Sequence, residues 1–372
     1  MFDNGKIISF SEMNVDVPIV STKHIIIEKL LGKGYFASVF LVYNTITNAN
    51  YALKISKQCK EQEFELNILK SMMHENILRM YSACFIDKNL ACVIELFNQF
   101  AAGGSLSDLL TYLDQSDYTV VQYQQNMISK DNFDWKIRIR LSLDIIRGLN
   151  YLHQRNLIHR DLSSQNIFLR IEKGNDHVHS KLTKSNDSNN NCNENLYLHQ
   201  SVEKQSFRLS EINCQLIDDE ITFLTMDSSE KIIFEKFNPL YSLENVEHFQ
   251  AIVGDMGLVL DLNRSDSDPM EIHGNPFYTA PEILLQKNPY SHSSDIFAFG
   301  LLCCELILCV VNDGSTVPRV QNFGLDSESM IVPVSCPSSF YDLAKECCSF
   351  EPDQRPTGVN IESTLSTILS AM

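Results

Sequence analysis

The chain has 372 residues and 44% of them are hydrophobic, which is enough apolar material for one large domain or for two lobes that share a cleft. Its net charge of −17 at pH 7 argues against nucleic acid or an anionic membrane as the main partner, because both need a basic surface. Residues 1–20 contain no basic segment followed by an apolar run, and the longest apolar stretch, 296–311, is too short for a membrane span. We therefore expect a cytoplasmic protein.

Strand-like segments dominate the first hundred residues, and helical patterns dominate the rest. The predicted elements of the first part are strands at 25–29, 38–42, 51–55 and 91–95 and a helix at 61–73. Farther on, apolar residues from Leu141 to Leu152 recur at helical spacing, and residues 296–308 are apolar almost all round, as in a helix in the middle of a lobe. The chain is therefore expected to divide into a strand-rich first part and a helical second part.

Two polar stretches interrupt this order. Residues 114–134 are expected to form a long loop, and residues 172–250 form a larger insertion. The insertion begins with an Asn-rich run, "SNDSNNNCNEN" at 185–195, which is typical of disorder. Its second part, near 212–237, mixes apolar and acidic residues, which is compatible with folding back onto the domain. Because a hairpin loop needs few residues, we expect the domain to fold without residues 176–246.

The first chemical motif is "LGKGYFASVF" at 31–40. Gly32 and Gly34 would let a turn approach phosphate oxygens closely, and Val39 would cover an adenine ring. Ala37 stands where a third glycine is usual. Two glycines at this spacing occur often by chance, so the motif alone is a weak signal.

The second motif is "YALKI" at 51–55. On a strand Ala52 and Lys54 share one face, so Lys54 would point into the same cleft as Ala52. A solvent-facing lysine fits equally well until a partner is identified. Glu65, on the predicted helix, is that partner, and an ion pair with it would hold Lys54 for the α- and β-phosphates of a nucleotide.

The most specific motif is "HRDLSSQN" at 159–166, which precedes the apolar "IFL". Phosphoryl transfer to a hydroxyl needs a carboxylate that orients the hydroxyl and accepts its proton, and Asp161 supplies it. The reaction also needs an amide oxygen for a metal ion, which Asn166 supplies. We interpret His159 as a packed structural histidine and Phe168 as a nucleotide contact.

A second metal ligand should follow on the next strand. "IVGDMGLV" at 252–259 offers Asp255, with Met256 where Phe is usual, and both side chains fill an apolar slot. Asp218 and Asp219 are rivals, but "IDDEI" lacks the glycine and the flanking strand pattern. We therefore predict a metal site at Asp255 and Asn166.

Residues 274–282, "GNPFYTAPE", form a predicted shelf on the substrate side of the site. Within it Glu282 has a plausible buried partner in Arg355, and breaking such a pair costs about 3–5 kcal/mol. Asp295 can accept hydrogen bonds from the backbone of the loop that carries Asp161. A simple helix N-cap explains Asp295 equally well.

These motifs, in this order, resemble those of the protein kinase superfamily from about residue 25 to 369. Ser163 stands where most Ser/Thr kinases have lysine. The runs "DLSS", "DIFAFGLLCCELI", "PRVQNFGLD" and "CPSSFYDLAKECCSFEPDQRP" are similar to the LIM kinase and testis-specific dual-specificity kinase (TESK) branch of the tyrosine kinase-like group. Met256, Tyr278 in place of the branch's Trp, and the 172–250 insertion depart from that pattern.

The resemblance implies an α+β, bilobal kinase fold. After an N-terminal extension, 1–24, the kinase domain would span 25–370, with a small β-rich N-lobe at 25–97 that carries one key helix. A larger, mainly helical C-lobe would span 98–370. Glu95 to Phe97 would form the hinge beside the adenine, and both residues are assigned to the nucleotide site.

The resemblance also implies ATP with Mg²⁺ or Mn²⁺ as cofactor and a protein substrate phosphorylated on Ser/Thr, with Tyr included by dual specificity. Cofilin-type actin-depolymerising proteins are the candidate substrates, which would place the chain in regulation of the actin cytoskeleton. The alternative is a pseudokinase scaffold that binds partners without turnover, motivated by Ala37, Met256 and the insertion.

Two serines near the predicted active site are candidate phosphorylation sites for activation. The segment between Asp255 and Gly274 carries hydroxyls at Ser265 and Ser267, and Arg160 beside Asp161 is a costly charge to bury. A phosphate on either serine could pair with such an arginine and order the segment. Acidic neighbours in the same segment could make that switch unnecessary.

Overall fold

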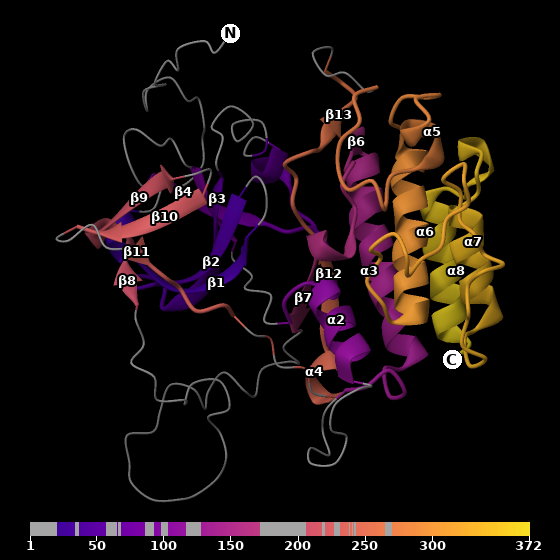
Figure 1. Ribbon diagram of the computed structural model, residues 1–372, viewed down its shortest axis with the longest axis horizontal. Coiled ribbons are helices and arrows are strands. Elements are labelled where there is room, and N and C mark those ends of the chain that lie inside the picture. The colour runs from indigo at the N-terminus through magenta and orange to yellow at the C-terminus, as the bar shows by residue number, and fades with distance from the viewer. Residues whose placement is uncertain are drawn as a thin grey trace, which may run out of the picture.

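The structure, a computed structural model, divides into a lobe of β-sheet and a lobe of helices that pack side by side (Figure 1). This arrangement confirms the predicted α+β, bilobal fold. The described residues are 21–33, 37–56, 65, 68–85, 93–97, 103–116, 128–171, 206–217, 220–226, 231–237, 239, 241, 243–264 and 270–372. Most of the N-terminal extension and the Asn-rich run lie outside them.

The N-lobe is built on a sheet with the strand order β4-β5-β3-β2-β1-β8. Its strands are β1 (Ile25–Lys33), β2 (Ala37–Asn44), β3 (Ala49–Ser56), β4 (Met80–Phe85), β5 (Val93–Phe97) and β8 (Phe207–Arg208). The prediction missed β4 and the contribution of β8. A short 3-10 helix, η1 (Thr22–His24), precedes β1, and within the predicted helix 61–73 residue Glu65 and residues 68–71 are helical.

The register of this sheet sorts its side chains onto two faces. Val39 lies opposite Lys54 across the β2–β3 pair, and the two therefore share the face that Ala52 also occupies. Phe40 lies opposite Leu53 on the other face, where both are buried. The face with Lys54 is the predicted nucleotide face. The face with Phe40 and Leu53 is apolar and must be buried by another part of the chain.

The C-lobe is mainly helical, with short strands at its edge toward the N-lobe (Figure 1). Its helices are α2 (Leu106–Ser116), α3 (Trp135–His153), α4 (Leu243–Glu247), α5 (Pro281–Leu284), α6 (His292–Leu308), α7 (Ser338–Cys347) and α8 (Gly358–Ser370), with 3-10 turns η2 (Ser164–Asn166) and η4 (Pro352–Gln354). Its strands are β6 (Leu157–Ile158), β7 (Ile167–Ile171), β12 (Phe249–Val253) and β13 (Leu260–Asp261).

Helix α6 runs through the middle of this lobe, and every residue from 294 to 307 is buried, as its apolar sequence predicted. The amphipathic α3 packs beside it. Strand β12 pairs antiparallel with β7 although the whole insertion separates them in sequence. None of the helices in the described part of the chain has both the length and the apolar content needed to cross a membrane.

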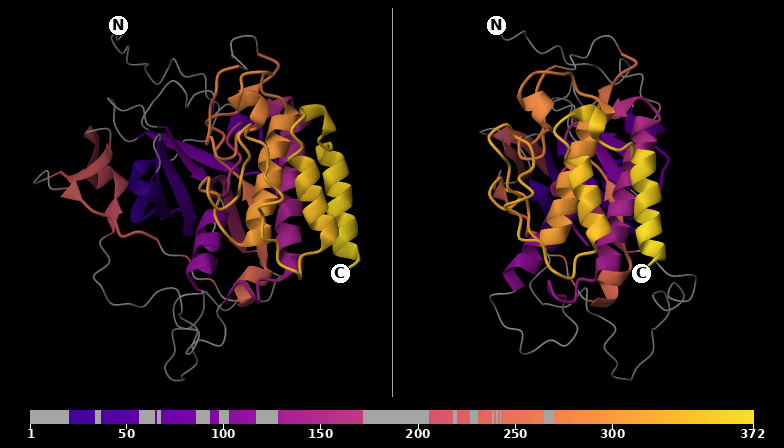
Figure 2. Two further views of the ribbon diagram at one scale, coloured as in Figure 1. Left: turned by 45° about the vertical axis from the view of Figure 1, so that its right-hand side comes forward. Right: turned by 90° about the vertical axis from the view of Figure 1, so that its right-hand side faces the viewer.

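The second part of the insertion folds onto the N-lobe. Strand β8 pairs with β1, and β9 (Ile212–Ile217), β10 (Glu220–Thr225) and β11 (Lys231–Ile232) form a separate small sheet, with η3 (Leu209–Glu211) before it. Figures 1 and 2 show this sheet on the side of the N-lobe that faces away from the helices. The sequence had indicated a return to the domain, and the structure shows that it covers the apolar face of β2 and β3.

Burial of aromatic and aliphatic side chains holds the small sheet in place. Phe223 is 2% exposed, and its ring meets the ring of Phe40 edge to face at 5.2 Å. Ile212 and Ile232 are buried in the same cluster. We therefore revise the expectation that the domain folds without residues 176–246, because removing the part from 206 onward would expose the outer face of the N-lobe sheet.

The insertion then crosses back to the C-lobe. Leu30 on β1 bonds to both neighbours of Lys236: its backbone nitrogen donates to Glu235 O at 2.9 Å, and its oxygen accepts from Phe237 N at 2.7 Å. Four residues later, Tyr241 is buried in the C-lobe core and its hydroxyl donates to Gly103 O at 3.0 Å. The insertion is thus bonded to both lobes within a few residues.

Phe223→Ala should lower the free energy of unfolding by about 3–5 kcal/mol, because the deletion leaves a cavity between the small sheet and the N-lobe sheet. Ile233→Ala is the matched control, since Ile233 is 78% exposed beside β11 and its loss should cost less than about 0.5 kcal/mol. Urea unfolding of the two variants and the wild type measures both values. Equal stability of the two variants would mean that the insertion is not part of the folded core.

Candidate active site

The side chain of Lys54 joins two carboxylates from different parts of the fold. Its ammonium lies 2.6 Å from Glu65 Oε1 and 2.9 Å from Asp255 Oδ1. Strand alternation turns Lys54 inward from β3, Glu65 comes from the helical segment, and Asp255 follows β12. The predicted Lys54–Glu65 pair is therefore formed, and a carboxylate of the C-lobe joins it.

Electrostatics at Asp255 favour its charged form. Burial alone would raise its pKa, but the charge of Lys54 and the hydrogen bond from its ammonium together hold the pKa of Asp255 below its usual value. The backbone at this residue is left-handed, with φ +57°. Met256 next to it is fully buried in the C-lobe core, as an apolar slot requires. The rivals Asp218 and Asp219 lie outside the described residues.

Asp161 and Asn166 lie together on the loop between β6 and β7. The side-chain amide of Asn166 donates to Asp161 O at 2.7 Å and to Asp161 Oδ2 at 2.9 Å. Because the nitrogen of that amide is used as donor, its oxygen is the atom available to a metal ion. Gly254 N donates to Asn166 O at 2.9 Å, so the β7–β12 pairing brings Asn166 beside the segment that carries Asp255.

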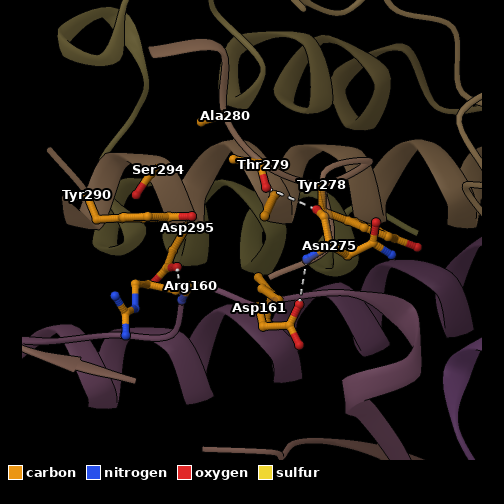
Figure 3. Close-up of a pocket in the computed structure, with 11 residues that line it drawn as sticks. Arg160, Asp161, Asn275, Tyr278, Thr279, Ala280, Tyr290, Ser294 and Asp295 are labelled. Atoms are coloured by element: carbon orange, nitrogen blue, oxygen red, sulfur yellow. Dashed lines mark hydrogen bonds between the residues drawn. The ribbon is translucent and has the colours of Figure 1, made fainter. Parts of the chain in front are cut away.

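The second carboxylate oxygen of Asp161 receives a hydrogen bond that the sequence analysis missed. Asn275 N donates to Asp161 Oδ1 at 3.0 Å, and Figure 3 shows this backbone group facing the carboxylate. The approach depends on Gly274, which has φ +81° and where a Cβ would lie 2.4 Å from Arg160 O. Burial, reinforced by the charge of Asp255, raises the pKa of Asp161.

The loop around Asp161 is hydrogen-bonded to Asp295 of α6. The carboxylate of Asp295 accepts from His159 N at 2.8 Å and from Arg160 N at 3.1 Å. His153 Nε2 lies 2.9 Å from the same carboxylate. Burial opposes ionisation, but these bonds and the nearby imidazoles hold the pKa of Asp295 below its usual value. Asp295 thus accepts from the loop backbone, as the sequence analysis had proposed.

His159 is packed in the interior and bonds to backbone groups, as expected of a structural histidine. It is fully buried, its Nε2 lies 2.9 Å from Gly254 O, and its Nδ1 accepts from Asp161 N at 3.3 Å. Arg160 donates from Nε to Leu258 O at 2.6 Å. Ser265 and Ser267 lie outside the described residues, so pairing of a phosphate there with Arg160 stays a prediction.

The predicted nucleotide contacts lie on the inner side of the N-lobe sheet and below it. Val39 and Ala52 are half-buried on the face of Lys54, and nothing lies within 4 Å of a Cβ built at Gly32. Phe168 on β7 packs against Gly254. Residues 95 and 97 pair with Lys54 and Ala52 across the β3–β5 ladder, but the side chains of Glu95 and Phe97, and all of Gly34, lie outside the described residues.

The shelf, residues 274–282, is fixed by the predicted Glu282–Arg355 pair. Two guanidinium nitrogens of Arg355 donate to the two carboxylate oxygens of Glu282 at 2.8 and 2.7 Å, and both side chains are buried. Arg355 also donates to backbone oxygens at Ser293, Ser349 and Phe350. The arginine therefore ties the end of the shelf to α6 and to the loop before α8.

A buried polar cluster behind the shelf was missed by the sequence analysis. Glu305 Oε1 accepts from Tyr278 Oη at 2.7 Å, Ser164 Oγ at 3.0 Å and Asn312 N at 2.7 Å. Burial raises the pKa of Glu305 to about 7, and the hydrogen bonds only partly oppose it. The available signal was a single glutamate within the apolar run 296–308, because a buried carboxylate needs hydrogen-bond partners.

Glu305→Gln should remove a pH dependence of stability. The pKa of Glu305 is raised from its ordinary 4.5 to about 7, so the folded protein keeps this proton to higher pH than the unfolded chain. Compared with the Gln variant, the wild type should be most stable at low pH. It should lose about 3 kcal/mol of this relative stability as the pH rises from about 4.5 to about 7, and little more above that. Urea unfolding of both proteins from about pH 4 to about pH 8 measures the difference, and a difference that is constant with pH would contradict the raised pKa.

Two protein-family models match most of the chain. A model of the protein kinase domain matches residues 25–192, and a model of protein tyrosine and serine/threonine kinases matches residues 244–365. Residues 193–243, between the two ranges, include strands β8 to β11 of the insertion. The matched parts thus contain the Lys54, Asp161 and Asp255 motifs, and the sheet that covers the N-lobe falls outside both.

Curated relatives match nearly the whole chain. Dual specificity testis-specific protein kinase 1 of Rattus norvegicus is 26% identical over 351 residues, which is 92% of this chain and 41% of the relative. Dual specificity testis-specific protein kinase 2 of Homo sapiens is 26% identical over 349 residues, 92% of this chain and 44% of the relative. The chain spans less than half the length of these relatives. It belongs to the protein kinase superfamily, where it is similar to the testis-specific dual-specificity kinases of the tyrosine kinase-like group.

Proposed function

We propose that this protein kinase is catalytically active and transfers the γ-phosphoryl group of ATP to hydroxyl side chains of a protein. The observation that carries the proposal is the assembled Lys54–Glu65–Asp255 cluster, with ammonium–carboxylate distances of 2.6 and 2.9 Å. Lys54, Asp255, Asp161 and Asn166 would supply the charged and amide groups that phosphoryl transfer needs, and Glu65 already pairs with Lys54.

Nucleotide binding would use the inner face of the N-lobe sheet. Lys54 would contact the α- and β-phosphates, and Gly32 and Gly34 would let the backbone approach them. Val39, Ala52 and Phe168 would enclose the adenine ring, with Glu95 and Phe97 at the hinge. The half-buried state of Val39 and Ala52 supports this assignment, since such side chains still have surface to bury against a ligand.

A divalent cation would be held by Asp255 and Asn166. The donor set fits Mg²⁺ or Mn²⁺, because both prefer carboxylate and amide oxygens and complete their shells with phosphates and water. The lowered pKa of Asp255 keeps its carboxylate charged, as a metal ligand must be. When bound, the cation would neutralise charge that develops on the phosphates.

Asp161 would orient the substrate hydroxyl and accept its proton. Its two carboxylate oxygens receive hydrogen bonds from Asn166 and from the backbone of Asn275, which fix the orientation of the group. A raised pKa brings a carboxylate closer to the range in which it accepts a proton efficiently. His159 would not compete for this role, because it is buried and bonded to backbone groups.

The proposed substrates are proteins phosphorylated on Ser/Thr and, by the dual specificity named for its relatives, on Tyr. Similarity to those kinases supports cofilin-type actin-depolymerising proteins as the first substrates to test. Met256 was one argument for the pseudokinase alternative. That argument is weaker because Met256 is fully buried in the apolar core beside Asp255. Incubation of purified protein with labelled ATP, Mg²⁺ or Mn²⁺ and a generic protein substrate separates turnover from a scaffold.

Lys54→Met should reduce phosphoryl transfer by about 100-fold or more, because the ammonium that positions the phosphates is gone. The fold should persist with lower stability, since Glu65 loses its ammonium partner. Lys29→Met is the control: Lys29 is a lysine on β1 of the same sheet, paired with Glu235 on the surface, and its loss should leave turnover unchanged. Near-normal turnover of Lys54→Met would remove the phosphate-contact assignment.

Asp161→Asn and Asp255→Asn should separate the two proposed carboxylate roles. The first variant should keep ATP affinity and lose transfer, because Asp161 would touch the hydroxyl and not the nucleotide. The second should lose transfer and also weaken ATP binding in the presence of Mg²⁺. Calorimetric titration with ATP, with and without Mg²⁺, measures this, and equal loss of affinity in both variants would contradict the assignment.

A further inference from the structure

The last part of the insertion connects the N-lobe to the C-lobe, and we call its residues 235–241 the strap. At the N-lobe end, Leu30 N donates to Glu235 O at 2.9 Å, and Leu30 O accepts from Phe237 N at 2.7 Å. Lys29 adds an ion pair with Glu235, which is exposed and contributes little. The two backbone bonds to β1 are therefore the N-lobe anchor of the strap.

The C-lobe anchor is the side chain of Tyr241. This side chain is packed in the C-lobe core, and its hydroxyl donates to Gly103 O at 3.0 Å. Burial, reinforced by the charge of Asp108, raises the pKa of Tyr241, so the hydroxyl stays protonated and remains a donor. Pro239 packs against the same turn, because a Cβ at Gly104 would lie 2.8 Å from Pro239 Cγ.

The two anchors lie beside the two sides of the proposed adenine site. On the N-lobe side, Leu30 is on β1, and the β1–β2 ladder also contains Val39. On the C-lobe side, Gly103 N donates to Leu169 O at 3.1 Å, and Leu169 directly follows Phe168. Because Val39 and Phe168 would enclose the adenine ring, the strap joins the segments that set the width of its site.

The strap is too short to let these segments move far apart. Four residues carry the chain from Phe237 to Tyr241. A fully extended chain covers at most about 3.3–3.6 Å per residue, so the strap reaches at most about 14 Å between its anchors. Pro239 within it has a fixed φ, which reduces the slack further. A larger separation of β1 from Gly103 would require one anchor to break.

The return of the chain to the C-lobe does not by itself require such a strap. The chain must come back from the small sheet to β12, but a return needs neither bonds to β1 nor a tyrosine buried beside Gly103. The outward connection, residues 172–206 between β7 and β8, is long enough to reach across any separation of the lobes. The short return is therefore the connection through which the insertion can restrain the lobes.

We propose that the strap is a positioning element, which sets the distance between the two sides of the nucleotide site and holds them in the arrangement that binds ATP. The inference rests on the proposed phosphoryl transfer and extends it to residues that touch neither ATP nor the peptide. With the strap in place, Lys54 of the N-lobe lies 2.9 Å from Asp255 of the C-lobe. A longer strap should let the lobes separate, so that ATP binds more weakly.

Insertion of Gly-Ser-Gly-Ser after Pro239 is the first test, because it doubles the chain length between the anchors and removes no contact. We expect the Kd of ATP in the presence of Mg²⁺ to rise about threefold, the factor that a doubled loop length gives for chain closure. The KM of a peptide substrate should stay unchanged, since the shelf lies wholly in the C-lobe. Calorimetric titration and steady-state kinetics measure the two quantities.

The same four residues inserted after Met226 are the matched control. Met226 is exposed at the end of β10, in the same insertion but outside the span between the anchors. Surface loops tolerate added length, so this variant should bind ATP as the wild type does. An equal rise of the Kd in both variants, or no rise in the strap variant, would overturn the proposal.

Tyr241→Phe is a second variant, which keeps the chain length and the buried ring and removes only the hydroxyl bond to Gly103. The Kd of ATP should rise about two- to fivefold, as for the loss of one neutral hydrogen bond. Tyr112→Phe is its control, because the Tyr112 ring lies 5.1 Å from that of Tyr241 but belongs to α2 and not to the strap. Equal ATP affinities of Tyr241→Phe and Tyr112→Phe would contradict a role for the C-lobe anchor.

The distance between the lobes supplies a readout that does not depend on nucleotide. Spin labels introduced as unnatural amino acids at Ile46 in the N-lobe and Val359 on α8 would measure it, since both side chains are exposed. The variant lengthened after Pro239 should show a broader distance distribution than the wild type and the Met226 control. If the wild type binds no ATP, the proposed function fails, and this measurement alone decides the strap: equal widths would overturn it.

Discussion

The ammonium of Lys54 is the group on which the geometry of the site depends. A buried ammonium is costly unless it is paired, and Lys54 meets that requirement with Glu65 of the N-lobe and Asp255 of the C-lobe. The side chain of Lys54 therefore links β3 to the helical segment of Glu65 and to the C-lobe. Because Asp255 follows the strand paired with β7, its position also fixes that of Asn166. The need to pair the ammonium of Lys54 thus brings the predicted nucleotide contacts and the predicted metal ligands together.

The second constraint on the fold is that the apolar outer face of the N-lobe sheet must be buried, and the insertion buries it. Side chains alternate across β2 and β3, so the inner face with Val39, Ala52 and Lys54 comes with an apolar outer face that includes Phe40 and Leu53. The insertion covers that face with Phe223 and its neighbours. It then bonds to Leu30, two residues before Gly32, and to Gly103 in the other lobe. The strand that leads into the glycine-rich turn is therefore held by a segment that also contacts the C-lobe.

Local spacing explains what could be predicted from the sequence. Strand alternation turned Lys54 inward and helical position supplied Glu65, while Asp161 and Asn166 lie on one short loop whose geometry a motif specifies. Asp255 was identified across a long insertion because its flanking pattern is also local. The destination of residues 206–241 and the partners of Glu305 depend on contacts between distant segments. No short pattern records which apolar face a β-segment will cover, or which hydroxyls reach a lone buried carboxylate.

Two carboxylates on α6 show how one helix can organise a site in two ways. Asp295 uses both oxygens, accepts two backbone N–H groups and lies beside imidazoles, and its pKa is lowered. Glu305 accepts on one oxygen from neutral donors, and its pKa is raised. Asp295 fixes the backbone around Asp161, whereas Glu305 bonds to the shelf through Tyr278. Helix α6 is buried along nearly its whole length. The loop that carries Asp161 and the shelf are therefore both hydrogen-bonded to the same rigid helix. Their relative position is therefore set by the core of the C-lobe.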